Sequence, residues 1–359
     1  MRINVTQSFL PPIEEYQQYL LKIWDNKWLT NNGPLLLELE DKLKEYLNTE
    51  NLLFVGNGTI ALQIAIKAME LKGEIITTPF SYCATTTSIL WENCQPVFVD
   101  INASDSNINV NLIEEAITEK TTAIMATHVY GLPCDVERIE EIANKYNLRV
   151  IYDAAHAFGV KYKNKSLLDY GDVSTCSFHA TKVFHTIEGG CIISKDAALH
   201  EKMLLYRSFG HLGDEYFSVG INGKNSEFHA AMGLANLPHL SEIIEGRKQV
   251  FNGYDAQLDF DKMYRPRFES EDFEYNYAYY PVVLKDEATT LQVIEALNKE
   301  NIYPRRYFYP SLNKLPYLTD QASCPVSEEI SLKVISLPLH PELEPEVVTK
   351  VSEIINQYA

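Results

Sequence analysis

The strongest constraint on the fold is an alternation of short apolar runs with helix-like stretches between residues 50 and 195. The expected strands are 52–55, 75–78, 96–99, 123–127, 149–153, 173–177 and 191–194, and the expected helices between them include 59–70, 111–119 and 136–146. This order predicts an α/β fold with a large, mostly parallel sheet and helices on both faces. Loops at the carboxyl edge of such a sheet usually bind the ligand, so we expect the chemistry there.

A chain of 359 residues, 46% of them hydrophobic, can build one large and one smaller domain. We expect residues 1–244 to form the large domain and residues 245–359 a smaller C-terminal α/β domain. Further helices are expected over 13–24, 36–47, 197–207 and 289–300 and from residue 228 onward, with a strand over 277–284.

Charge and cysteine usage exclude several classes of protein. A net charge of −18 argues against nucleic-acid binding, which requires a basic face. The six cysteines show no CxxC spacing, and several lie in apolar runs where a reduced thiol acts as a small hydrophobic group. We therefore expect a reducing, cytoplasmic location and no metal site. No stretch has the length and apolarity of a membrane span, so no membrane partner is expected.

The segment 177–190 contains one lysine, Lys182, between an apolar strand end and the turn at Gly189 and Gly190. Burial between apolar elements disfavours the ammonium form, which leaves a free amine able to attack a carbonyl. Lys182 is therefore the candidate nucleophile. A surface lysine whose stem lies along apolar residues is the alternative.

Asp153 ends the expected strand 149–153 and is followed by small residues. An acid at the carboxyl end of a buried strand faces the ligand crevice and needs a cationic partner, for which a protonated pyridine nitrogen is suitable. A cap on the following segment would also explain this aspartate.

Gly58 and Thr59 lie in a glycine turn between the expected strand 52–55 and the helix 59–70. Strand, glycine turn and helix start together form an anion site, because unpaired amides and the helix dipole point at the ligand. A tight turn with a threonine cap is the alternative, and neither a P-loop nor a dinucleotide fingerprint is present.

Several further motifs occur in the order of one known family. They are Asn57-Gly58-Thr59, Pro79-Phe80-Ser81-Tyr82, Pro96-Val97-Phe98-Val99-Asp100, His128-Val129-Tyr130-Gly131, Asp153-Ala154-Ala155-His156, Ser177-Phe178 with Thr181-Lys182, and Ser226-Glu227-Phe228. The chain resembles sugar-nucleotide aminotransferases of the DegT/DnrJ/EryC1/StrS type, pyridoxal-phosphate enzymes of fold type I, from residue 28 to residue 341. Ile187, where the family often has glycine, and Lys224, where arginine is common, depart from the pattern.

The resemblance implies roles around pyridoxal 5'-phosphate. Lys182 would bond to the cofactor and move the proton, and Asp153 would keep the ring nitrogen protonated. The other implied contacts are Tyr82 on the ring, His156 near the phenolic oxygen, and Gly58, Thr59, Ser177 and the partner subunit's Asn222 on the phosphate. The last contact implies a homodimer with shared active sites. Taken alone, Tyr82 is an ordinary half-buried tyrosine, His156 a satisfied strand-end residue and Asn222 part of a capping turn.

Candidate substrate residues lie in several loops. Arg305 and Tyr307 belong to a basic and aromatic cluster that could bind a pyrophosphate or stack on a base, or could be a surface charge pair. Trp28 and Thr30 lie in a turn-rich segment that covers the active site in the resembled family, or that is a plain connector. The other candidates are His179, His185 and Lys224.

The resemblance implies L-glutamate as amino donor and a nucleotide-linked keto-deoxy sugar as acceptor. The segment 177–190 is more similar to enzymes that aminate C4 than to the 3-amino type, whose lysine usually follows proline-glycine. The expected reaction therefore converts dTDP-4-keto-6-deoxy-D-glucose into dTDP-4-amino-4,6-dideoxy-D-glucose, for O-antigen or other glycans. Alternatives are the C4 epimer, a 3-keto substrate, a dehydratase of the same fold, in which histidine replaces the lysine, and a non-catalytic cofactor-binding regulator.

Overall fold

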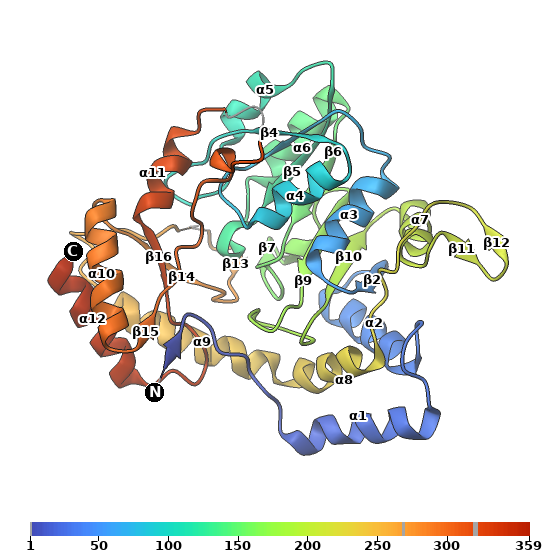
Figure 1. Cartoon of the computed structure of the whole chain (residues 1–359), viewed down its shortest axis with the longest axis horizontal. Coiled ribbons are helices and arrows are strands. Elements are labelled where there is room, and N and C mark those ends of the chain that lie inside the picture. Colours follow the sequence, from blue (N-terminus) through green and yellow to red (C-terminus); the bar gives the residue numbers. More distant parts are fainter. Residues whose placement is uncertain (1, 268–269, 319–321) are drawn as a thin grey trace.

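A seven-stranded sheet in the order β2-β10-β9-β6-β5-β3-β4 forms the centre of the molecule (Figure 1). The computed structural model describes residues 2–267, 270–318 and 322–359. The strands are β2 (Leu52–Val55), β3 (Glu74–Thr77), β4 (Gln95–Phe98), β5 (Thr121–Thr127), β6 (Arg149–Asp153), β9 (Val173–Ser177) and β10 (Gly190–Ser194). β10 is antiparallel to both neighbours, and the other pairings in this sheet are parallel. The predicted mostly parallel sheet is confirmed.

Helices cover both faces of this sheet, because successive side chains of a strand point to opposite sides. Leu52 and Phe54 of β2 belong to one buried cluster and Leu53 and Val55 to another. The first cluster includes α2 (Pro34–Leu47), α6 (Val136–Tyr146) and α8 (Glu227–Asn236), and the second includes α3 (Gly58–Ala68), α4 (Cys83–Trp91) and α7 (Ala197–Arg207). The prediction of helices on both faces is thus confirmed.

The expected helix 111–119 is shorter in the structure. A 3-10 turn, Val110–Leu112, leads into α5 (Ile113–Ala116), after which Ile117 is extended. Side-chain hydrogen bonds replace the helix here: Thr121 Oγ1 accepts from the Thr118 N–H at 2.9 Å, and Thr118 Oγ1 accepts from the Lys120 N–H at 3.0 Å. Threonine hydroxyls that bond to nearby amides compete with the helical pattern and end it.

The C-terminal part builds its own buried cluster. The helices and strands of the C-terminal part are α9 (Leu240–Asp255), β14 (Tyr280–Val283), α10 (Glu287–Lys299), β15 (Ile302–Tyr303), α11 (Pro325–Lys333), β16 (Val334–Leu337) and α12 (Pro345–Tyr358). Helix α9 joins both parts, because Ile243 packs in the sheet cluster and Phe251 in the C-terminal one. The N-terminal strand β1 (Ile3–Asn4) pairs with β15. The division into 1–244 and 245–359 stays a prediction.

Helix α1 (Ile13–Asn26) and several short strands complete the fold. The strands are β7 (Lys161–Tyr162), β8 (Lys165–Ser166) and β13 (Phe273–Glu274), and the hairpin of β11 (His211–Leu212) and β12 (Glu215–Tyr216) that projects from the body at the right of Figure 1. Within the described ranges, no helix combines the length and apolarity that crossing a bilayer requires.

Candidate active site

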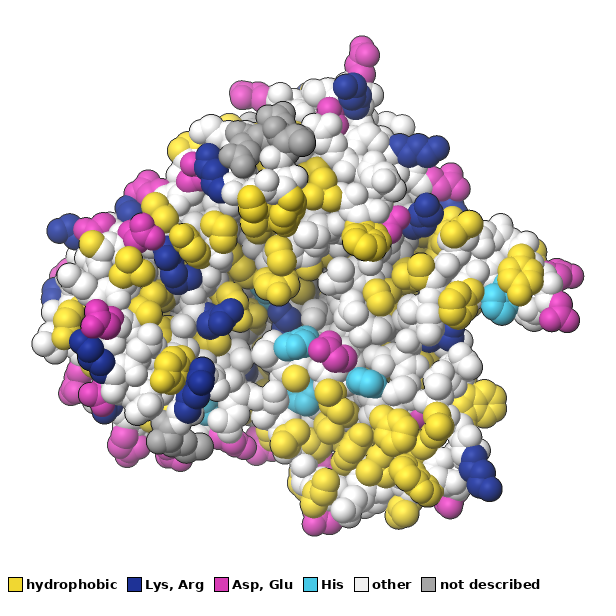
Figure 2. All heavy atoms as spheres, in the orientation of Figure 1, with side chains coloured by type: hydrophobic (Ala, Val, Ile, Leu, Met, Phe, Trp, Pro, Cys, Tyr) yellow, Lys and Arg dark blue, Asp and Glu magenta, His cyan; other side chains and the backbone are white. Residues whose placement is uncertain are grey.

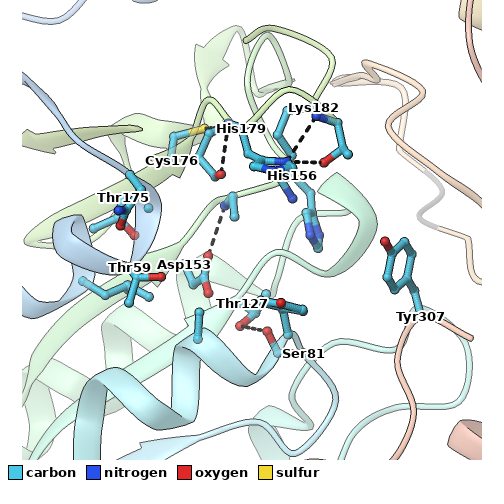
Figure 3. Close-up of a pocket in the computed structure, with 18 of the residues that line it drawn as sticks. Thr59, Ser81, Thr127, Asp153, His156, Thr175, Cys176, His179, Lys182 and Tyr307 are labelled. Atoms are coloured by element: carbon cyan, nitrogen blue, oxygen red, sulfur yellow. Dashed lines mark hydrogen bonds between the residues drawn. The ribbon is translucent and has the colours of Figure 1, made fainter. Parts of the chain in front are cut away.

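A cavity of about 380 Å³ lies at the carboxyl edge of the central sheet, where β5, β6 and β9 end and α3 begins. Ten of the residues predicted from the sequence line it: Gly58, Thr59, Tyr82, Asp153, His156, Ser177, His179, Lys182, Arg305 and Tyr307 (Figure 3). Parallel strands bring their carboxyl ends to one edge, which explains why side chains so distant in sequence meet.

Lys182 lies in the loop after β9 and is partly buried. Its Nζ donates to the hydroxyl of Tyr279 at 3.4 Å. Tyr279 comes from the C-terminal part of the chain, and its ring meets that of His156 edge to face at 4.9 Å. The amine therefore sits in the cavity between the sheet edge and an aromatic wall, as a nucleophile for a carbonyl requires.

Asp153 is the last residue of β6 and is buried. Burial raises the pKa of its carboxyl group, and two hydrogen bonds and the nearby charge of Lys182 act in the opposite direction. The Thr85 hydroxyl donates to Oδ2 at 2.6 Å, and the Ala155 N–H donates to Oδ1 at 3.1 Å. Both bonds favour the carboxylate form, which is the form that can pair with a protonated ring nitrogen.

His156 is buried, and burial holds the pKa of its imidazole well below the ordinary value, with a smaller contribution from the charge of Lys182. Its Nδ1 accepts a hydrogen bond from the Tyr130 N–H at 3.2 Å. In a neutral imidazole the other nitrogen then carries the proton. The ring stacks on Phe308 at 5.7 Å, which fixes its plane. Nε2–H is thus a donor for a phenolic oxygen.

The turn before α3 has the features of a phosphate site. Asn57 caps the helix, its side chain accepting from the Ile60 N–H at 2.8 Å, and the first amides of a helix have no partner within it. A Cβ atom placed on Gly58 would lie 3.1 Å from Cβ of Ser177, so a larger residue would fill this cradle. Together with Lys182, Asp153 and His156, the cradle fits pyridoxal phosphate.

Five predicted residues lie outside this cavity. Trp28 and Thr30 are exposed and bond to each other, the Trp28 Nε1–H donating to the Thr30 carbonyl. Asn222 is exposed and Lys224 partly exposed, on a loop held to the strand end by the bond from Gly56 N–H to Gly223 O at 2.9 Å. Their substrate and cofactor roles stay predictions.

His185 is the fifth residue and does not line the cavity. Its side chain is buried, and Nε2 bonds to the Phe9 carbonyl at 2.7 Å while Asn236 packs beside the ring. Burial lowers the pKa of this imidazole. In this conformation His185 anchors the N-terminal segment, and its predicted contact with substrate has no support from the geometry.

Sequence reasoning missed other residues at the site. Ser81 and Thr127 line the cavity, and Thr85 bonds to Asp153. The position of Thr127 at the end of an expected strand could have indicated it, since Thr127 pairs directly with Asp153 in the sheet. Tyr279 and Phe308 have no such local signal, because they reach the cavity only through the packing of the C-terminal part.

Comparisons with known proteins show which family the chain belongs to. The model of the DegT/DnrJ/EryC1/StrS aminotransferase family matches residues 12–356. A dTDP-4-amino-4,6-dideoxy-D-glucose transaminase of Shigella dysenteriae is 42% identical over 99% of this chain and 98% of its own, and an enzyme of the same name from Escherichia coli is 40% identical over 98% of each chain. The solved structure of DesI with its TDP-sugar product is 29% identical and superposes with a TM-score of 0.93 over 99% of this chain and 92% of DesI. These matches confirm the predicted fold type I, and the chain belongs to the DegT/DnrJ/EryC1/StrS aminotransferase family.

Proposed function

We propose that this aminotransferase moves the amino group of L-glutamate to C4 of dTDP-4-keto-6-deoxy-D-glucose and releases dTDP-4-amino-4,6-dideoxy-D-glucose. The observation that carries the proposal is the placement of Lys182, Asp153 and His156 around one cavity at the sheet edge. The choice of sugar, nucleotide and carbon rests on the names of the two relatives at 42% and 40% identity.

The cofactor is pyridoxal phosphate, which supplies an electron-accepting ring that stabilises negative charge at the α-carbon of the amino donor. Lys182 Nζ would hold its aldehyde carbon, and Asp153 would pair with its ring nitrogen. The Gly58 and Thr59 amides and the Ser177 hydroxyl would hold its phosphate. His156 would donate from Nε2 to its phenolic oxygen.

Proton transfer is the task of Lys182. As a free amine, its Nζ takes the proton from the donor α-carbon, and as an ammonium group it returns a proton to the accepting carbon. The Tyr279 hydroxyl, 3.4 Å away, restricts the range of Nζ positions while the amine is free. His156 stays neutral through both halves of the reaction, because burial holds the pKa of its imidazole well below the ordinary value, and Asp153 would act as a carboxylate in both.

Arg305 and Tyr307 line the cavity and are the proposed nucleotide contacts. Figure 3 shows Tyr307 across the cavity from Asp153. The Arg305 guanidinium lies 5.7 Å from the centre of the Tyr307 ring and forms no ion pair with any described carboxylate. The adjacent Arg306 is already bound to Glu287 at 3.0 Å. Arg305 is therefore the cation of this pair that remains available for a pyrophosphate.

A homodimer is the second part of the proposal, and an exposed apolar surface supports it. Figure 2 shows apolar side chains gathered at the lower end, where Figure 1 places α1 and α8. Exposed apolar residues on α1, α2 and the loop between them are Ile13, Leu21, Trp24, Trp28, Leu29 and Leu37. Patches of this kind usually mark an interface.

In such a dimer the partner subunit's Asn222 would complete the phosphate site. The location proposed for the enzyme is the cytoplasm, which the six unpaired thiols suit.

The oligomer is tested by light scattering of the protein after gel filtration. The wild type is expected to elute with twice the mass of the chain, and Trp24→Glu is expected to give monomer, because a charge in the apolar patch opposes its burial. A monomeric wild type would refute the dimer and with it the shared site.

The reaction is tested by incubating the purified protein with L-glutamate and a panel of keto sugar nucleotides and locating the new nitrogen by NMR. Amination at C4 of the dTDP sugar supports the proposal. Nitrogen at C3, a deoxygenated product, or cofactor colour that glutamate fails to bleach would each overturn it. Lys182→Ala is expected to abolish turnover, whereas Lys42→Ala, on the exposed side of α2, should leave it unchanged.

A further inference from the structure

A row of buried hydroxyl groups ends at the Asp153 carboxylate. Thr127 Oγ1 donates to Ser81 Oγ at 3.2 Å, Ser81 Oγ lies 2.8 Å from Thr85 Oγ1, and the Thr85 hydroxyl donates to Asp153 Oδ2 at 2.6 Å. Each of the three hydroxyl side chains is buried. Figure 3 shows the bond between Thr127 and Ser81 on the side of the cavity where Asp153 lies.

The direction of these bonds follows from the number of protons. A carboxylate only accepts, so Thr85 spends its single proton on Asp153. The Thr85 oxygen must then accept from Ser81, and Ser81 in turn accepts from Thr127. All three protons therefore point toward the carboxylate, and hydrogen bonds aligned in this way polarise one another.

The three hydroxyl groups come from three separate elements. Thr127 ends β5 and pairs in register with Asp153, Ser81 follows β3, and Thr85 lies in the first turn of α4. Burial on α4 does not by itself require a partner, because the buried hydroxyl of the next residue, Thr86, has none among the described residues. The bond from Thr85 to Asp153 is therefore not a general consequence of burying a hydroxyl group on α4.

We propose that Ser81, Thr85 and Thr127 act as positioning residues that hold Asp153 as a carboxylate aimed at the cofactor's ring nitrogen. The inference rests on the role of Asp153 given under the proposed function. Burial opposes this charge state by raising the pKa of the carboxyl group, and the hydroxyl row is one of the groups that oppose that effect. The other ionisable groups beside Asp153 are Lys182, which favours the carboxylate, His156, which is neutral, and Cys176, whose thiol stays protonated because burial raises its pKa to about 12.

The test uses the holoenzyme carrying a cofactor labelled with ¹⁵N in its ring, and compares Thr85→Val with Thr85→Ser. Loss of a hydrogen bond to a charged group changes an equilibrium by about 10- to 100-fold. In Thr85→Val the ratio of ring-protonated to ring-unprotonated cofactor should fall by that factor, so the ¹⁵N resonance moves toward the unprotonated value. Cofactor affinity, measured as a function of pH, should begin to fall at a pH about one to two units higher than in the wild type. Thr85→Ser, which keeps the hydroxyl, should restore both readouts.

Thr86→Val is the matched control, because it makes the same chemical change one residue away, at a hydroxyl without a described partner. Ser81→Ala is a second variant, expected to shift both readouts in the same direction by a smaller factor. The role of the hydroxyl row is refuted if Thr85→Val keeps the wild-type resonance and affinity profile, or if Thr86→Val shifts them equally. Asp153→Asn separates the two proposals. A wild-type resonance in that variant refutes the role of Asp153 itself. A shift in Asp153→Asn but not in Thr85→Val refutes only the role of the hydroxyl row.

Discussion

The ion pair between Glu40 of α2 and Arg207 of α7 joins two helices on opposite faces of the sheet. Arg207 Nη1 lies 2.6 Å from Glu40 Oε1, and the two side chains are only 2% and 8% exposed. Both groups also bond to the backbone of Phe54 in β2, Nη1 donating to its carbonyl at 2.9 Å and Oε1 accepting from its N–H at 2.8 Å. The pair is therefore bonded to the backbone of β2, the edge strand that leads into the turn before α3.

Replacement of Arg207 by Met should destabilise the protein strongly. It leaves the Glu40 carboxylate buried without its cation, and breaking a buried pair in this way costs about 3–5 kcal/mol. The same helix offers a control, since Lys202 lies 2.7 Å from Glu70 but the two side chains are 36% and 72% exposed. Water screens such a pair, so Lys202→Met should lower the free energy of unfolding far less than Arg207→Met does. Burial, not distance, distinguishes the two pairs.

Thermal unfolding followed by circular dichroism measures the difference. Loss of 1 kcal/mol lowers the melting temperature of a chain of 359 residues by about 1–2 °C, which predicts a decrease of about 3–10 °C for Arg207→Met and a much smaller one for Lys202→Met. The double variant Glu40→Leu with Arg207→Met should recover part of the loss, because it removes the unpaired charge as well. Equal shifts in Arg207→Met and Lys202→Met, or no recovery in the double variant, would refute the reasoning.

Three further predictions concern single positions. Gly58→Ala should weaken cofactor binding about tenfold by dialysis, since its Cβ would lie 3.1 Å from Ser177, whereas Gly56→Ala, whose nearest neighbour would be at 3.6 Å, should bind normally. Burial lowers the pKa of His128 to about 3, so the unfolded chain binds the extra proton between about pH 6.5 and pH 3 and stability should fall as pH falls through this window, by up to about 1.4 kcal/mol per unit. Urea titrations at several pH values should show that the free energy of unfolding changes less with pH in His128→Asn than in the wild type. An unchanged pH dependence would contradict this. Ile187 has a φ of 69°, which costs a β-branched residue about 1–2 kcal/mol, so Ile187→Gly should raise the urea midpoint despite the entropy of glycine, and a lower midpoint would count against strain there.

Local pattern was sufficient for the main features of the sheet and for the residues at its edge. The strands that end at Asp153 and Ser177 have the predicted bounds. Each is a short apolar segment, and the local sequence pattern is sufficient to identify it as a strand. Once such strands are parallel, their carboxyl ends coincide, so Asp153, Gly58 and Lys182 meet without further information. Ile187 has a left-handed backbone, a conformation that favours glycine, which is the residue that the family resemblance led us to expect at this position.

The chemical state of the site required the tertiary structure. The proton of His156 is placed on Nε2 by an amide from Tyr130, and the charge of Asp153 is supported by Thr85, 68 residues earlier in the chain. Tyr279 reaches Lys182 from a different part of the molecule, and His185, close to the lysine in sequence, is turned away by Phe9. Periodicity and propensity act over a few residues, so they determine where strands and helices form. Hydrogen bonds and burial join residues at any separation, and in this protein they decide which of the side chains brought to the sheet edge are charged, which are neutral and which face the cavity.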